Sequence, residues 1–115
     1  MVENQMDKRL FERFKARFPV KFEHSRDDFG SKVFLRDASG QGIKISSRDR
    51  LFKNDSVSLL VQLPDGAEPM MLSGKVVWVK ESSPDLWDIG LQFHKTNLMK
   101  MRRIFKLVQT PAFIF

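Results

Sequence analysis

The pattern of apolar and polar residues changes from helical to strand-like near Pro19. Residues 4–17 place Met6, Leu10 and Phe14 on one side at helical spacing, which predicts a helix. Pro19 disfavours continuation of that helix, because proline restricts the residue before it to extended conformations. Beyond Pro19, short segments alternate apolar and polar residues, as half-buried strands do.

The alternating segments predict six strands and a final helix. The strands are 18–24, 31–36, 42–46, 57–63, 70–80 and 87–93, and the helix is 97–108. Gly74 inside the fifth strand predicts a bend or a bulge. Thr96 or Asn97 is suited to cap the helix, because both side chains can accept a hydrogen bond from a free backbone amide.

This order of elements predicts a mostly β protein. Six closely spaced strands without helices between them are typical of an antiparallel sheet. Closure into a six-stranded antiparallel β-barrel would remove the unpaired edges. We therefore expect such a barrel, with a short helical segment before it and an α-helix after it.

Length and composition fit one domain that favours anionic partners. The chain has 115 residues and a net charge of +6, from 20 Lys and Arg against 14 Asp and Glu. It has no Cys and two His, which excludes disulfides and leaves little for a zinc site or a His-based triad. No apolar run is long enough to span a bilayer, and the charged N-terminus is not typical of a signal peptide. We expect a cytoplasmic domain.

Two segments carry more specific chemistry. Arg13 and Arg17 form an Arg-x-x-x-Arg pair just before the first strand. Arginine presents a fixed fork of donors that fits phosphate oxygens or the O6/N7 edge of guanine, and its flat face stacks on bases. Taken alone, the pair also fits a solvated basic end of a helix.

The second segment is the hexapeptide from residue 37 to residue 42, between two predicted strands. Asp37 accepts hydrogen bonds, Ser39 both donates and accepts, and Gly42 allows a close backbone approach to a ligand or a positive φ. An ordinary Asp/Ser/Gly turn would have the same composition.

Together, the two segments resemble the PilZ domain family, the bacterial receptors for cyclic di-GMP. The resemblance rests on Arg13 and Arg17, on the Asp-x-Ser-x-x-Gly hexapeptide, on the later strand 74–79 and on a closing strand at 88–93. A helix after that strand also fits. The resemblance covers residues 9 to 108.

The resemblance implies a cyclic di-GMP receptor and adaptor with a PilZ-like barrel and no enzymatic activity or cofactor. It implies that Arg13, Arg17, Asp37, Ser39 and Gly42 bind the nucleotide, and that binding orders the N-terminal arm. The expected organisation is a helical or switch segment at 1–18, a barrel with its helix at 18–110, and an apolar tail at 111–115.

The arginine pair has a second register. Arg9, Arg13 and Arg17 repeat at spacing four, so Arg9 and Arg13 also match the motif. We favour Arg13 and Arg17, because the strand begins directly after them. Arg9, Lys15 and Gly40 remain additional candidate contacts. Glu12 precedes the motif where an arginine would favour a stacked ligand dimer by analogy with the family, so it favours a single ligand.

Expected partners are cyclic di-GMP and an unidentified protein, with the chain as a monomer or a weak homodimer. Nucleic acid is not an expected partner. Two alternatives remain open at this point. One is a PilZ-like interaction module that does not depend on nucleotide. The other is a basic β-barrel that binds single-stranded nucleic acid, which the +6 charge and the mixture of Phe and Arg would suit.

Overall fold

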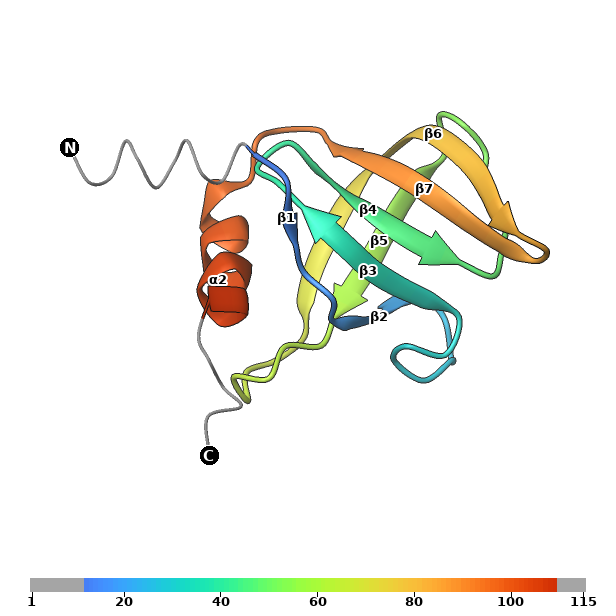
Figure 1. Cartoon of the computed structure of the whole chain (residues 1–115). Coiled ribbons are helices and arrows are strands. Elements are labelled where there is room, and N and C mark those ends of the chain that lie inside the picture. Colours follow the sequence, from blue (N-terminus) through green and yellow to red (C-terminus); the bar gives the residue numbers. More distant parts are fainter. Residues whose placement is uncertain (1–11, 110–115) are drawn as a thin grey trace.

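The computed structural model describes residues 12–109, which form a strand-rich body with a helix at one end (Figure 1). The elements are β1 (Phe14–Lys15), β2 (Pro19–Phe22), β3 (Val33–Ala38), β4 (Gly42–Ser47), β5 (Ser56–Val61), β6 (Met70–Ser83), β7 (Leu86–Phe93) and α2 (Leu98–Gln109). Every strand pairing is antiparallel.

The strands close into a barrel. The strand order is β1-β3-β2-β5-β6-β7-β4, and β3 pairs with β4 as well, which joins the two sides of the sheet. β1 pairs with the C-terminal half of β3 and β2 with its N-terminal half. β1 and β2 therefore act as one interrupted barrel strand. The predicted six-stranded antiparallel barrel is confirmed.

The core follows from the alternation of residues along the strands. The largest fully buried side chains on the strands are Val20, Val33, Leu35, Ile43, Ile45, Leu59, Val61, Leu72 and Ile89. Burial of each such side chain contributes about 1.5–3 kcal/mol before entropy is counted. Together they fill the barrel and hold its loops in fixed positions.

Helix α2 lies at one end of the barrel (Figure 1). It buries Met101, Ile104 and Phe105 in the same core. Asn97 caps the helix as predicted, because its Oδ1 accepts a hydrogen bond from the backbone amide of Lys100 at 3.3 Å. The helix begins and ends one residue later than the sequence predicts.

An ion pair links α2 to the loop between β5 and β6. Arg103 donates two hydrogen bonds to Asp65, from Nε at 2.8 Å and from a terminal nitrogen at 2.9 Å. These bonds hold the pKa of the Asp65 carboxyl below its usual range and raise the pKa of Arg103. In this loop Gly66 has a φ of 77°.

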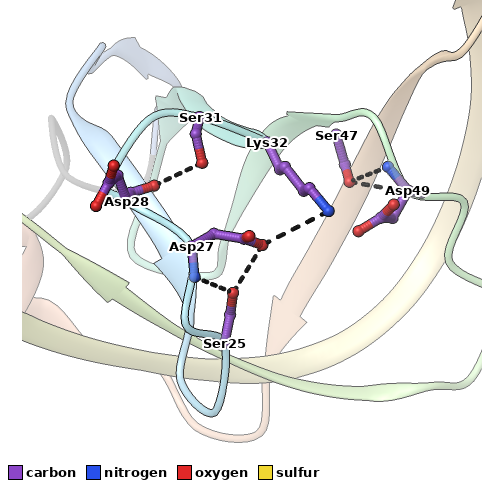
Figure 2. A network of polar contacts seen from close by, with 7 residues as sticks. All are labelled: Ser25, Asp27, Asp28, Ser31, Lys32, Ser47 and Asp49. Carbon is purple, nitrogen blue, oxygen red and sulfur yellow. Dashed lines mark hydrogen bonds and ion pairs between the residues drawn. The ribbon is translucent and has the colours of Figure 1, made fainter.

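The stretch between β2 and β3 is held by side-chain hydrogen bonds (Figure 2). Ser25 donates a hydrogen bond to Asp27 at 2.8 Å and accepts one from the Asp27 amide at 2.9 Å. Ser31 donates to the backbone carbonyl of Asp28 at 2.8 Å, and Lys32 lies 3.9 Å from the Asp27 carboxylate. Short polar side chains thus fix the loop where no core is available.

The predicted helix at residues 4–17 is wrong where it can be tested. Its described part is extended, with β1 at Phe14–Lys15, while residues 4–11 lie outside the described residues. Phe14 and Ala16 face inward, and Lys15 between them is exposed. The same residues fit the alternation of a strand as well as the spacing of a helix. Pairing with the backbone of β3 selects the strand.

Three strand details also differ from the sequence prediction. β2 ends at Phe22, so residues 23 and 24 are not part of it. β3 continues to Ala38, which places Asp37 on a strand and not in a loop. The register shifts in β6 lie between Val76 and Trp78 and between Glu81 and Ser83, and not at Gly74. A Cβ on Gly74 would stand 2.7 Å from the Gln92 carbonyl oxygen, so close packing of strands explains that glycine.

Candidate functional site

The loop between β3 and β4 is a tight, internally bonded turn. The Ser39 amide donates to the Gly42 carbonyl at 2.8 Å, and the Gly42 amide donates back to the Ser39 carbonyl at 3.4 Å. The Ser39 side chain is buried, and its Oγ accepts a hydrogen bond from the Gln41 amide at 3.2 Å. The buried hydroxyl therefore stabilises the turn through this hydrogen bond.

The same loop is attached to the rest of the fold on two sides. The Phe93 amide at the end of β7 donates to the Gln41 carbonyl at 2.9 Å. The Asn97 amide, at the start of α2, donates to the Gly40 carbonyl at 3.0 Å. The loop is thus held by backbone hydrogen bonds from the end of β7 and from the residue before α2.

Gly42 has a structural reason of its own. A Cβ at this position would collide with the carbonyl oxygen of Leu91 on the neighbouring strand β7. Its φ is not among the positive values, which among the described glycines occur at Gly30 and Gly66. Of the two roles that the sequence allowed for this glycine, a positive φ does not occur, and the close approach that requires the glycine is that of β4 to β7.

Arg13 is held next to this loop by an ion pair. The register of β1 on β3 pairs Lys15 with Asp37, which brings the preceding arginine to the loop. Arg13 donates a hydrogen bond to Asp37 Oδ1 at 2.5 Å. The Asp37 side chain is 21% exposed and that of Arg13 is 51% exposed. Arg13 from the first motif and Asp37 from the second are thus in direct contact.

The segment that carries the arginines is anchored from its inner side. The Phe14 ring meets the Phe105 ring of α2 edge to face, with centroids 5.0 Å apart, and Ala16 is fully buried. Arg13, Lys15 and Arg17 are all exposed on the outer side. In an extended chain Arg13 and Arg17 are about 13 Å apart along the strand, twice their separation on a helix.

A cavity of about 220 Å³ is lined by residues from both motifs. Its lining residues are Arg13, Ser39, Gln41, Gly42, Val77, Leu91 and Gln92. Of the predicted site residues, Arg13, Ser39 and Gly42 line the cavity. Asp37 does not line it but forms the ion pair with Arg13. Arg17, Lys15 and Gly40 do not line it, and Arg9 lies outside the described residues.

Sequence reasoning missed the walls contributed by β6 and β7. Gln92 is opposite Gly42 in the pairing of β4 with β7, and Val77 is the extra residue in the bulge of β6. Neither residue belongs to a motif. A correct strand pairing from Gly42 would have found Gln92, but the bulge that places Val77 leaves no signal in the sequence.

The other cavities and side-chain groups of the described residues do not indicate a second kind of chemistry at this site. Larger cavities occur elsewhere, but they contain none of the predicted site residues. Within residues 12–109 no group of His, Asp or Glu is arranged to hold a metal ion. No helix in that part of the chain is long and apolar enough to cross a membrane.

Comparison with known proteins places this geometry in context. The family model of the PilZ domain matches residues 7–109. Among solved structures, the chain is similar to the Bacillus subtilis inhibitor of motility, MotI/DgrA, with a TM-score of 0.57 and 13% sequence identity, over 82% of this chain and 46% of that one. The chain therefore spans about half the length of that protein, and the likeness concerns the fold. No curated protein matches the sequence.

Proposed function

This chain belongs to the PilZ domain family, and we propose that it is a cyclic di-GMP receptor and adaptor. PilZ domains are receptor and adaptor modules, and we propose no catalytic step and no cofactor for this one. The observation that carries the proposal is the cavity that Arg13 shares with Ser39 and Gly42, the residues that the family resemblance selects.

The chemistry of the site suits a ligand with two phosphates and two guanines. Arg13 has five donors, and the ion pair with Asp37 leaves others free for phosphate oxygens or a guanine edge. Arg17 is exposed, so it is available for a second contact. Gln41 and Gln92 add side-chain amides at the cavity wall.

The proposed roles of the hexapeptide residues differ from one another. Asp37 orients Arg13 through the ion pair, while Ser39 and Gly42 hold the loop in the shape that forms the cavity floor. Lys15 and Gly40 are outer contacts in this proposal. Glu12, which is exposed beside Arg13, favours one ligand over a stacked pair because its charge opposes a second dianion.

The proposed signal is an ordering of the arm before Arg13. A ligand that bridges the arginine segment and the 39–42 loop would add contacts to the strand pairing and the ion pair that already join this segment to β3. A protein partner would bind the surface that this ordering creates. We place this receptor in the cytoplasm.

Calorimetric titration of the purified chain tests the proposal. Cyclic di-GMP is the ligand, and GTP and a short single-stranded DNA are the controls. Saturable binding of one ligand per chain, absent with both controls, is the expected result. Binding of DNA with a steep salt dependence would support the basic-barrel alternative. No heat and no thermal shift with cyclic di-GMP would favour a nucleotide-independent interaction module.

A further inference from the structure

Strand β6 extends beyond the strand that flanks it on one side. Its pairing with β5 runs from Met70 to Lys75, and the Val76 amide and carbonyl still bond to Asp55 and Asn54 at 2.9 and 2.8 Å. From residue 77 to residue 83, β6 pairs with β7 alone. Within the described chain, this stretch therefore has an open edge on the side where β5 flanks the first half of the strand.

The open edge presents backbone groups to an incoming strand. Val76 directs its amide and carbonyl toward the β5 side, and alternation carried through the bulge at residue 77 directs those of Val79 and Glu81 the same way. Such groups are a template for another chain in extended conformation.

A groove of about 360 Å³ lies along this edge. It is bounded by residues 50–53 on one side and residues 77–79 on the other. Two large apolar side chains border it in exposed positions, Phe52 at 58% and Trp78 at 38%. Exposed aromatic side chains of this kind are enriched at the anchor points of protein interfaces.

The charge of the groove indicates what kind of chain would fit. The Arg50 guanidinium lies 5.0 Å from the Phe52 ring centre and 4.9 Å from that of Trp87, so it is held against two aromatic rings. Among the described residues, no carboxylate pairs with Arg50, and none pairs with the exposed Lys53 or Lys80. An oriented arginine fork with free donors is suited to a carboxylate.

We propose that the open edge of β6 binds an extended, acidic segment of a partner protein as an added strand. Backbone pairing along residues 77–83 supplies the direction of the segment, the Phe52 and Trp78 rings hold an apolar side chain, and Arg50 with Lys53 selects acidic neighbours. A second copy of this chain is a poorer occupant, because each copy carries a net charge of +6 and would place like charges in the groove.

This surface is separate from the nucleotide site in most of its residues. Only Val77 lines both the groove and the cavity beside Arg13. The inference does not rest on nucleotide binding, so failure of one proposal leaves the other standing.

Selection from a random peptide library tests the proposed partner chemistry. The full chain is used as bait, with unstructured displayed peptides of about ten residues, a length that covers one strand. The expected result is enrichment of peptides in which acidic residues alternate with apolar ones. The best peptide is then synthesised, and its affinity is measured against three variants.

The variants separate edge pairing, charge and general effects. Glu81→Pro removes the edge-facing amide at an exposed position and should weaken binding by about tenfold or more. Lys53→Glu reverses a groove charge and should weaken binding similarly. Lys95→Glu makes the same charge change outside the groove and should leave the affinity unchanged.

Three outcomes would overturn the proposal. They are a selection that yields no acidic preference, peptides that bind Glu81→Pro as tightly as the parent, and a dimer in sedimentation analysis that Glu81→Pro dissociates, since the dimer would make a second copy the occupant. Circular dichroism of each variant establishes that the barrel is intact before binding is compared.

Discussion

Arg13 and Asp37 form an ion pair at 2.5 Å that joins the segment before β1 to strand β3. The aspartate is the more buried of the two, so its position is set by the barrel and the arginine adjusts to it. One side chain from each sequence motif thus takes part in a single contact at the edge of the cavity. This contact makes the contribution of Arg13 dependent on Asp37.

The coupling between these residues can be measured. Arg13→Ala and Asp37→Ala should each weaken cyclic di-GMP binding, the second because Arg13 loses its orientation. The double variant should be hardly worse than Arg13→Ala alone, with a coupling energy of about 0.5–3 kcal/mol. Calorimetry on the four proteins gives the cycle. Strictly additive losses would mean that Asp37 contacts the ligand independently.

Arg17 offers a different test, because it is exposed and lines no cavity. Arg17→Ala should leave the melting temperature unchanged and weaken cyclic di-GMP binding by roughly 1.5–3 kcal/mol, the value of a charge-assisted hydrogen bond. Arg17→Lys should restore little, because lysine lacks the planar fork. A loss below about threefold in titration would remove Arg17 from the site and favour the register with Arg9.

Gly42 should be sensitive to substitution for a reason of stability. Gly42→Ala would place a Cβ against the Leu91 carbonyl, so the pairing of β4 with β7 must shift. We expect a loss of about 1–3 kcal/mol in the free energy of unfolding, measured with urea. Gly66→Ala is the matched control, since its Cβ would have no neighbour within 4 Å and only its positive φ would be strained. Equal losses would contradict the packing explanation.

The Arg103–Asp65 pair predicts a pH dependence of stability. The folded state holds the pKa of Asp65 below its unfolded value, mainly through the hydrogen bonds from Arg103. The stabilisation is therefore complete above about pH 4, the usual range of a free carboxyl, and is lost as the pH falls through the lower pKa of the folded state.

Asp65→Asn isolates this effect. The variant should melt below the parent at pH 7, and the difference should shrink as the pH falls below about 4. Asp85→Asn, at an exposed position that takes part in no ion pair of the described residues, provides the matched carboxyl-to-amide change. A difference that stays constant from pH 7 to about pH 3 would show that the charge of Asp65 is not what fastens α2.

The sequence by itself determined the barrel and the content of the two motifs. Apolar residues at every second position indicate strands, and Asn97 ahead of an apolar stripe indicates a helix start. The residue types of Arg13, Asp37 and Ser39 indicated a binding site only through the family resemblance, because each motif alone also fits an ordinary surface segment.

Only the tertiary structure decided how those residues meet. The segment from Arg13 to Arg17 satisfies helical and strand spacing alike, and pairing with β3 together with the Phe14–Phe105 contact selects the strand. The cavity walls at Val77 and Gln92 come from strands far along the chain. Their placement depends on ladder register and on a bulge, which are set by hydrogen bonds between distant backbones and leave no local pattern in the sequence.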